Sequence, residues 1–313
     1  MKKVIYLITL IVLIIYPNLS YSNEKITVLL DWFINPDHAP LFIALEMGYF
    51  DENGLEVKFI APTDPNDPPK LVAAGKADLA ISYQPQLHIQ VDQGLKLKRI
   101  GTIIATPLNS LVVLKDGPIK KISDLKGKKV GYSVGGFENA ILGKMLSENG
   151  LSIEDIKLIN VNFSLSPALI SKNVDAVIGA FRNFELNQLR ILGKEGKAFY
   201  VEEHGVPAYD ELIIVAKSDN VEEEKFVKFM NAMEKGVQYL INNPNKSWKL
   251  FIKNRKNLDD ELNRRAWKDT LPRFALRPGA FDKVRYKKFG EFLEKNKMIK
   301  KSLSAENYGL QIE

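Results

Sequence analysis

Apolar and polar residues follow one another in two alternating patterns along most of the chain. Short apolar or alternating runs have the length of β-strands, as in LEVKFI (55–60), and apolar residues at helical spacing separate them, as between residues 39 and 50. This alternation predicts an α/β fold with parallel sheets and crossover helices. The predicted strands cover residues 26–32, 55–60, 78–82, 99–105, 110–115, 128–133, 156–162, 174–181 and 211–217.

Two segments share one layout. LVAAGKADLAIS (71–82) and LISKNVDAVIGA (169–180) each combine a short helix, a turn, an aspartate and a buried strand, with Asp78 and Asp175 in equivalent positions. The repeat predicts two similar α/β units and hence two lobes. Helix–turn–strand units are common, so a coincidental likeness stays open as the alternative.

The pattern changes after the last predicted strand. Residues 221–242 predict a long helix that stops near Pro244, and helical segments continue to about Lys300. The sequence shows no obvious strand in this part of the chain. We expect a helical tail of this size to pack onto one lobe rather than to form a domain of its own.

The N-terminus has the parts of an export signal. Two lysines precede an unbroken apolar run over residues 4–15, and Ser20 and Ser22 supply small residues where a signal peptidase cuts. The apolar run is too short to span a bilayer comfortably. We therefore expect residues 1–22 to be a cleaved signal peptide, with a retained membrane anchor as the alternative.

The chain contains no cysteine. An exported protein without cysteine has no disulfide, no thiol nucleophile and no thiolate metal site. It also has no cysteine for lipid attachment at the signal cleavage site. These absences favour a free periplasmic protein over a lipid-tethered one.

Charge and histidine content exclude several other classes. The net charge of +6 falls to +4 when Lys2 and Lys3 leave with the signal peptide, and no basic run is interleaved with exposed aromatic residues, so no nucleic-acid partner is expected. His38, His88 and His204 lack the spacing of metal ligands, and no phosphate-loop or dinucleotide fingerprint is present. We expect neither a metal nor a cofactor.

The first candidate site follows the first predicted strand. The stretch LLDWFINPDHAPLF turns from apolar residues to Asp31, Trp32, Asn35, Asp37 and His38, with two prolines that restrict the backbone. In open α/β sheets, ligands bind at the carboxyl ends of strands. Acids and an amide beside an indole suit a flat, nitrogen-rich ring, which would stack on the indole and donate its N–H groups to the acids. A core position for Trp32 is the alternative.

Other strand ends carry further candidates. Tyr83 offers a second aromatic ring, and Asn109 lies between two strands where the chain could hinge. Glu185 follows the strand of the second repeat, where it could accept from a ligand N–H or be an ordinary acid at a helix N-terminus. Tyr209 and Glu211 lie at the start of the last strand.

The stretch GYSVGGFEN matches the G-x-S-x-G pattern of a hydrolase nucleophile elbow, between a predicted strand and a helix. Ser133, Asp175 and His204 also occur in the order of such a triad. No oxyanion stretch precedes the motif, however, and His204 is the only histidine after it. The competing interpretation is a glycine-rich loop, with Gly135 and Gly136, whose free N–H groups bind a ligand oxygen.

The sequence also resembles a known family. It is similar to the periplasmic binding proteins of importers that salvage pyrimidine precursors of thiamine, and to the related eukaryotic enzyme that makes the thiamine pyrimidine. The likeness covers most of residues 25–255. Importers of sulfonates, nitrate and riboflavin share part of this layout, and the D-W pair and the G-V-P-x-Y-[DE]-E segment point to pyrimidines. The matching stretches are LLDWFINPDHAPLFIALEMGYFDENGLEV, DPNDPPKLVAAGKADLAIS, DLKGKKVGYSVGGFE, VDAVIGAFRNFE and GVPAYDELIIVAK.

The resemblance implies a type II periplasmic binding protein fold, in which two lobes, each a mixed sheet flanked by helices, close on the ligand. The expected lobes are residues 23–108 with 206–313, and residues 109–205. The resemblance gives binding roles to Asp31, Trp32, Tyr83, Gly135, Gly136, Glu185, Tyr209 and Glu211. Asn35, His38 and Asn109, from the same strand ends, complete the candidate ligand site.

Two departures argue against the enzyme branch. Its cysteine-rich motif is replaced here by HGVPAYDE, and its cofactor lysine aligns with Ser82. We therefore expect a monomeric binding protein that passes its ligand to a membrane permease. The sequence leaves open the aminomethyl, formylaminomethyl and hydroxymethyl pyrimidines, and riboflavin or another heterocycle as alternatives.

Overall fold

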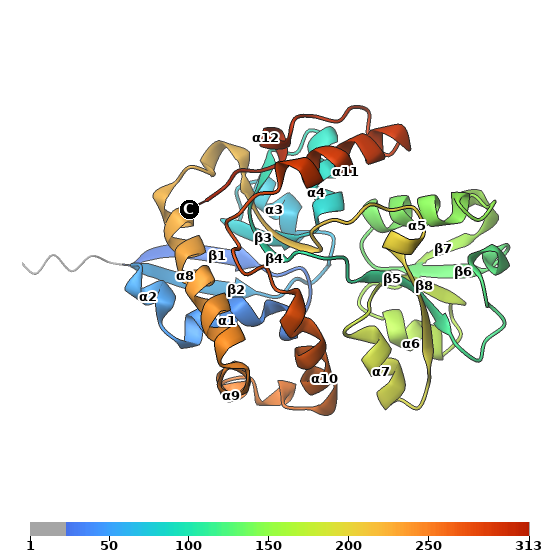
Figure 1. Ribbon diagram of the computed structural model, residues 1–313, viewed down its shortest axis with the longest axis horizontal. Coiled ribbons are helices and arrows are strands. Elements are labelled where there is room, and N and C mark those ends of the chain that lie inside the picture. The colour runs from blue at the N-terminus through green and yellow to red at the C-terminus, as the bar shows by residue number, and fades with distance from the viewer. Residues whose placement is uncertain (1–22, 313) are drawn as a thin grey trace, which may run out of the picture.

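The protein has two lobes that lie side by side, each built on a five-stranded sheet (Figure 1). The computed structural model describes residues 23–312, so the predicted signal peptide lies outside the described residues. The strand order is β2-β1-β3-β10-β4 in the first sheet and β7-β6-β8-β5-β9 in the second. The predicted two-lobed α/β fold is confirmed.

The strands of each sheet come from separate parts of the chain. The first sheet contains β1 (Glu24–Leu29), β2 (Leu55–Ile60), β3 (Leu79–Ser82), β4 (Leu97–Ile104) and β10 (Leu212–Lys217). The second contains β5 (Asn109–Leu114), β6 (Lys129–Tyr132), β7 (Lys157–Asn160), β8 (Ala176–Phe181) and β9 (Gly196–Tyr200). The chain therefore passes between the sheets twice, after β4 and after β9.

Both sheets are mixed, because one strand in each runs against its neighbours. β10 is antiparallel to β3 and β4, and β5 is antiparallel to β8 and β9, whereas β1 and β6 pair in parallel with both neighbours. The reversed strands are the two that follow the passages between the sheets. The alternation of strands and helices thus predicts the wrong direction for β5 and β10, and the mixed sheets expected from the family resemblance are confirmed.

Helices cover both sheets (Figure 1). The α-helices are α1 (Ala39–Glu46), α2 (Tyr49–Glu52), α3 (Pro68–Ala73), α4 (Gln84–Asp92), α5 (Phe137–Ser147), α6 (Leu165–Ile170), α7 (Glu185–Ile191), α8 (Glu224–Asn242), α9 (Pro244–Lys253), α10 (Glu261–Thr270), α11 (Lys283–Lys295) and α12 (Ala305–Tyr308). Single 3-10 turns are η1 (Pro36–His38), η2 (Ile122–Leu125), η3 (Ile153–Asp155), η4 (Val201–Glu203), η5 (Ser218–Asn220), η6 (Lys256–Leu258) and η7 (Leu271–Arg273). Within residues 23–312, no helix combines the length and the apolar character needed to cross a membrane.

The long helix α8 packs against α1 and α2 on the first lobe. Its apolar residues recur every three or four positions, so they form one buried face. Phe229 on this face stacks against Phe50, with ring centroids 5.0 Å apart. Gly236 lets α8 approach α1 closely, because a Cβ there would lie 2.7 Å from the Pro40 carbonyl oxygen.

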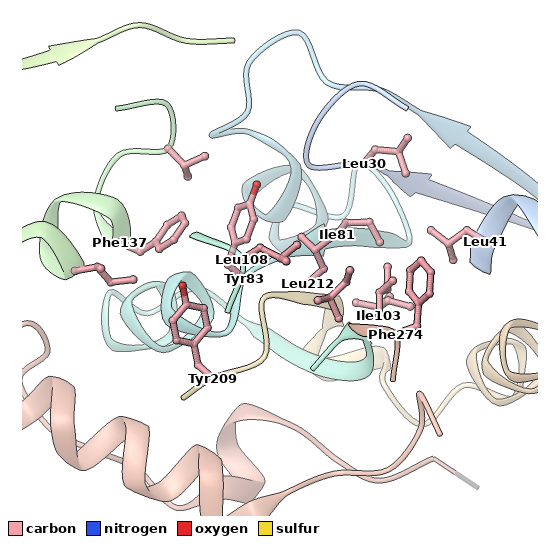
Figure 2. Packing of buried hydrophobic residues seen from close by; sticks show 14 of the residues in the cluster. Leu30, Leu41, Ile81, Tyr83, Ile103, Leu108, Phe137, Tyr209, Leu212 and Phe274 are labelled. Carbon is pink, nitrogen blue, oxygen red and sulfur yellow. The ribbon is translucent and has the colours of Figure 1, made fainter. Parts of the chain in front are cut away.

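The apolar core continues from one lobe to the other. One cluster of buried side chains includes Leu30 and Ile81 of the first lobe and Phe137 of the second (Figure 2). The rings of Tyr83 and Phe137 stack across the junction, with centroids 4.8 Å apart. The lobes are therefore in contact at this junction.

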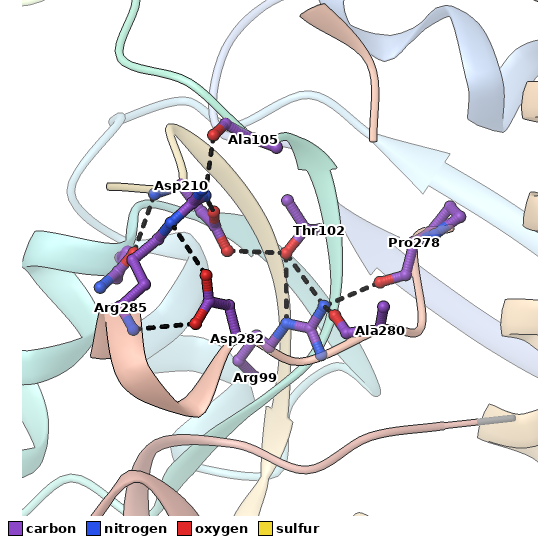
Figure 3. Close-up of polar contacts among 9 residues, drawn as sticks. Arg99, Thr102, Ala105, Asp210, Pro278, Ala280, Asp282 and Arg285 are labelled. Carbon is purple, nitrogen blue, oxygen red and sulfur yellow. Dashed lines mark hydrogen bonds and ion pairs between the residues drawn. The ribbon is translucent and has the colours of Figure 1, made fainter. Parts of the chain in front are cut away.

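A buried arginine fastens the C-terminal segment to the first sheet (Figure 3). The Arg99 guanidinium is fully buried and donates to the carbonyls of Pro278 (2.8 Å) and Leu310 (3.0 Å) and to the Thr102 hydroxyl. Thr102 in turn donates to Asp210 (2.9 Å), which pairs with Arg285. A buried cation is costly unless its N–H groups are hydrogen-bonded. Carbonyl groups of the C-terminal segment supply several of these bonds, so the network holds that segment against β4.

Candidate functional site

A cavity lies between the two lobes, lined by residues that follow the carboxyl ends of β1, β3, β6 and β8. The cavity is narrow in this arrangement of the lobes, with a volume of about 30 Å³. The lining residues are Asp31, Trp32, Asn35, Asp37, Tyr83, Ser133, Val134, Glu138, Leu165, Gly179, Phe181, Phe184 and Glu185.

The loop after β1 is held in shape by its own side chains. Asn35 caps the turn η1, with its Oδ1 accepting from the Asp37 N–H at 2.8 Å. Pro36 at the first position of the turn fixes the backbone angle that the turn requires. The Asn35 N–H donates to Nδ1 of His38 at 3.3 Å. The loop therefore presents Asp31 and Trp32 from a constrained backbone.

Asp31 is a buried acid that two side chains orient. Its side chain is 4% exposed and accepts from His38 Nε2 at 2.9 Å and from the Tyr83 hydroxyl at 2.8 Å. Because His38 Nδ1 already accepts from Asn35, Nε2 carries the proton and donates to Asp31. Burial and the Asp31 charge raise the pKa of Tyr83 well above its usual value, so its hydroxyl remains a donor. Each Asp31 oxygen keeps a lone pair for a ligand N–H.

The second lobe adds two buried acids, Glu138 and Glu185. Glu138 Oε2 accepts from the Ser133 N–H at 2.8 Å, and Glu185 Oε2 accepts from the Phe181 N–H at 2.6 Å. Burial raises the pKa of each carboxyl group from its usual 4.5 to about 8. Near neutral pH these groups therefore hold protons in the empty site. A protonated carboxyl group can donate to a ring nitrogen and accept from a neighbouring amino group.

Gly179 makes room for Glu138. It has a φ of +89°, which favours glycine, and a Cβ there would overlap Glu138 Oε1. Its N–H donates to Asn109 Oδ1 at 3.0 Å, which fixes the backbone of β8 at this point. Asn109 thus supports the cavity wall from behind.

Aromatic rings pack together beside Trp32. Trp32 is half-buried and meets the edge of Phe163, from the second lobe, with ring centroids 4.5 Å apart. Phe33 packs against the same Phe163 ring at 5.0 Å. Because Trp32 lines the cavity and is not enclosed by the core, the alternative of a core position does not hold.

Polar contacts join the two lobes around the cavity. The Asn66 amide accepts from the Gly135 N–H at 2.8 Å and donates to the Ser133 carbonyl at 3.2 Å. On another side, the Asn183 amide donates to Asp37 Oδ1 at 2.6 Å and to the Thr270 hydroxyl at 2.7 Å. These contacts describe a closed arrangement of the lobes.

The two passages of the chain between the sheets are tied by a single carboxylate. Glu211 Oε2 accepts from the backbone N–H groups of Leu108 (2.6 Å) and Asn109 (2.8 Å) and from the Tyr209 hydroxyl (3.2 Å). Burial raises the pKa of Glu211 to about 7. Arg182 donates to the Asn109 carbonyl at 3.2 Å. These groups hold the two passages of the chain together.

The side chains of the hydrolase motif have other partners. The Ser133 hydroxyl donates to the Asn162 carbonyl, and Asp175 accepts from the Lys129 N–H at 2.8 Å. His204 packs its ring edge against Phe199, with centroids 5.9 Å apart. The arrangement does not join Ser133, Asp175 and His204 into a nucleophile–base pair. Within residues 23–312, no group of three or more His, Asp or Glu residues is arranged to hold a metal ion.

The predicted candidates fall into two groups. Asp31, Trp32, Asn35, Tyr83 and Glu185 line the cavity. The others are not among the lining residues. His38 and Asn109 orient residues of the lining, Gly135 bonds to Asn66 of the other lobe, Tyr209 and Glu211 join the two passages of the chain, and Gly136 directly precedes α5.

Several participants were not among the predicted candidates, among them Glu138, Asn66 and Thr270. Glu138 directly follows the glycine-rich loop, and an acid in the first turn of a helix is a signal that could have identified it. Asn66 and Thr270 lie in segments with no strand end, so no pattern in the sequence points to them.

Comparisons with known proteins connect this geometry to one family. The sequence model of the family described as "NMT1/THI5 like" matches residues 35–247. A Haemophilus influenzae protein with a provisional assignment to thiamine biosynthesis is 52% identical over 295 residues, 94% of each chain. The formylaminopyrimidine-binding protein of Halalkalibacterium halodurans is 34% identical over 242 residues, 77% of this chain and 72% of its own. A 4-amino-5-hydroxymethyl-2-methylpyrimidine phosphate synthase of Saccharomyces cerevisiae is 27% identical over 254 residues, 77% of this chain and 74% of the enzyme.

Solved structures agree on the fold. The periplasmic aliphatic sulphonate binding protein of Escherichia coli superposes with a TM-score of 0.67 at 14% identity, covering 93% of each chain. The alkanesulfonate-binding protein of Xanthomonas axonopodis pv. citri gives a TM-score of 0.70 at 13% identity, covering 91% of this chain and 97% of its own. At these identities the likeness establishes the two-lobed fold alone.

Proposed function

The chain belongs to the NMT1/THI5-like family, and from that premise we propose that it binds a pyrimidine precursor of thiamine and delivers it to an ABC importer. The observation that carries the proposal is the combination of an indole, Trp32, with buried carboxyl groups in one narrow cavity. An aminopyrimidine has a flat face for the indole and N–H groups for the acids. The names of the two bacterial relatives, formylaminopyrimidine binding and thiamine biosynthesis, support this choice of ligand.

In the proposed complex the pyrimidine ring lies against Trp32. Its exocyclic amino group donates to Asp31, which His38 and Tyr83 already orient. Glu185, from the second lobe, pairs with the opposite edge of the ring. Because the two acids come from different lobes, ligand binding favours the closed arrangement.

We further propose that the protein works in the periplasm, after loss of residues 1–22, as a monomer. Its lobes would be residues 23–108 with 206–313, and residues 109–205, with the hinge at the segments that Glu211 joins. A permease could then distinguish loaded from empty protein by shape.

We also propose that the protein is not a catalyst, although synthases are among its relatives. Ser82 stands where the resemblance to the synthases would require the cofactor lysine. Its hydroxyl donates to Gln86 at 2.8 Å in a fully buried environment. This position therefore offers no amine for a Schiff base.

Native mass spectrometry of protein purified from its own cells tests the proposed function. We expect a copurified ligand with the mass of an aminomethyl, formylaminomethyl or hydroxymethyl pyrimidine, lost on mild unfolding. A copurified ligand with the mass of riboflavin or another heterocycle would contradict the pyrimidine assignment. Turnover of an added pyrimidine or of a serine-reactive phosphonate would contradict the assignment as a binding protein.

A further inference from the structure

The loop between β6 and α5 has the sequence of an anion-binding loop, but its amide groups are occupied by the protein itself. Glycine-rich loops at helix N-termini commonly hold phosphate through free backbone N–H groups. Here the N–H of Ser133 donates to Glu138 Oε2 at 2.8 Å, and the N–H of Val134 also hydrogen-bonds to this carboxyl group. The N–H of Gly135 donates to Asn66 Oδ1 at 2.8 Å. A phosphate group would therefore find these donors taken.

The structure accommodates Glu138 specifically. The side chain is buried, and Gly179, with its φ of +89°, leaves the space that the carboxyl group fills. Asn109 fixes Gly179 by accepting from its N–H at 3.0 Å. A residue with a Cβ at position 179 would overlap Glu138 Oε1. The Glu138 carboxyl group is therefore a buried part of the cavity wall.

The rest of the cavity also disfavours an anion. Asp31, Asp37 and Glu185 line it together with Glu138, and no lysine or arginine is among the lining residues of the described chain. Arg182, in the nearby hinge, is paired with Glu202 at 2.6 Å. The His38 Nε2 proton is already donated to Asp31. A phosphate group would enter a desolvated site with no free cation among its lining residues to balance its charge.

We propose that this cleft accepts the unphosphorylated pyrimidine and excludes its phosphate ester, and that Glu138 determines the selectivity by filling the anion position of the loop. This inference rests on the proposed function, because it concerns the same cleft. It separates the chain from its relatives that are named for the phosphate. The raised pKa of Glu138 is consistent with it, since a protonated carboxyl group still occupies the two N–H groups.

Calorimetric titration with 4-amino-5-hydroxymethyl-2-methylpyrimidine and with its phosphate ester tests the proposal. We expect wild-type protein to bind the ester at least about 100-fold more weakly than the alcohol. Glu138→Ala frees the N–H groups of Ser133 and Val134, and should reduce this ratio by about tenfold or more. Glu185→Ala is the matched control, because it removes a carboxyl group from the same cavity and leaves the loop filled. It should reduce the ratio by about threefold or less.

The outcomes separate the two proposals. Wild-type protein that binds both compounds equally overturns the selectivity and leaves the pyrimidine function intact, whereas protein that binds no pyrimidine overturns the function itself. Equal effects of Glu138→Ala and Glu185→Ala would mean that the anion position of the loop does not set the selectivity, which would overturn the proposal. If Glu138→Ala does not fold, the same titrations with Glu138→Gln test the proposal. Its amide oxygen still accepts from the loop, so the ratio should stay near that of wild type, and a reduction of about tenfold would overturn the proposal.

Discussion

Asp31 combines a structural role with availability to a ligand. Its two oxygens accept from His38 and Tyr83, which fixes the carboxylate, and both oxygens keep capacity for another donor. Pre-orientation of this kind reduces the entropy lost when a ligand binds. A chain of hydrogen bonds runs from the Asn35 N–H through the His38 ring to Asp31, and it gives the histidine of this loop a role.

Trp32→Ala should weaken pyrimidine binding by about 1–3 kcal/mol, because the ring loses its stacking partner. Calorimetric titration measures the affinity of each protein. Tryptophan fluorescence would not serve, because Trp32→Ala keeps only Trp248 and Trp267, which pack against each other in the tail with centroids 5.3 Å apart and should not respond to the ligand. Trp32→Phe, which keeps an aromatic face, should lose less. Unchanged affinity in Trp32→Ala would mean that the ring binds elsewhere.

The buried acids predict a stability that falls as the pH rises. Glu138 and Glu185 have pKa values of about 8 in the folded protein against a usual 4.5, so the folded state binds protons more tightly than the unfolded chain. The free energy of unfolding of the empty protein should therefore decrease from about pH 4.5 to about pH 8. Thermal melts between pH 5 and pH 8 measure this. Glu138→Gln combined with Glu185→Gln should show a smaller decrease, and an unchanged decrease would exclude these two groups as its source.

The cavity residues that the sequence predicts are those that directly follow a recognisable strand. Asp31, Trp32, Tyr83 and Glu185 each follow a recognisable strand, and all four line the cavity. Tyr209 and Glu211 are also at a strand end, but Glu211 bonds to Tyr209 and to the backbone of residues 108 and 109. No sequence pattern indicates the direction of these side chains. Contacts that form only when two lobes meet, such as that of Asn66, depend on the tertiary structure alone.

At the scale of elements, the internal repeat has a structural explanation. Asp78 Oδ2 accepts from the Thr27 N–H in the first lobe, and Asp175 Oδ2 accepts from the Lys129 N–H in the second, both at 2.8 Å. In each lobe the aspartate before a buried strand therefore fixes that strand to its parallel neighbour. The two segments share their layout because each uses an aspartate to fix the start of a central strand.

Strands and helices with strong periodicity were predictable, and the exceptions have physical causes. The long helix α8 has a continuous apolar face, which the sequence shows directly. β9, at the edge of the second sheet, was not predicted, because its flanks are rich in glycine and charged residues. The directions of β5 and β10 depend on how the chain passes between the lobes. The local periodicity of the sequence does not show this.

Gly236→Ala tests the packing of the helical tail. A Cβ at this position would lie 2.7 Å from the Pro40 carbonyl oxygen and 2.9 Å from Ala44 Cβ, so α8 would have to move away from α1. We expect a loss of about 1–3 kcal/mol in the free energy of unfolding, measured by urea denaturation. Gly143→Ala is the control, since its nearest neighbour would lie 3.7 Å away and the change should stabilise helix α5 by about 0.5–1 kcal/mol. Equal effects of the two changes would contradict the close approach.

At the scale of the whole molecule, ligand binding is expected to shift the lobes toward the closed arrangement. Asn66 and Asn183 form polar contacts across the cavity, and a ligand that touches both lobes would add to these contacts. Small-angle scattering should show a smaller radius of gyration at saturating pyrimidine than in the empty protein. Asn66→Ala should reduce the affinity while leaving the ring contacts intact. An unchanged radius, together with normal binding by Glu185→Ala, would mean that the second lobe takes no part.

The most direct test of the account is a crystal structure of the protein with formylaminopyrimidine. The ring should lie in the cavity against Trp32, with its amino group within hydrogen-bonding distance of Asp31 and its opposite edge near Glu185. Glu138 should still accept from the Ser133 N–H. A ligand bound outside this cavity, or one whose polar edge faces away from both acids, would contradict the account.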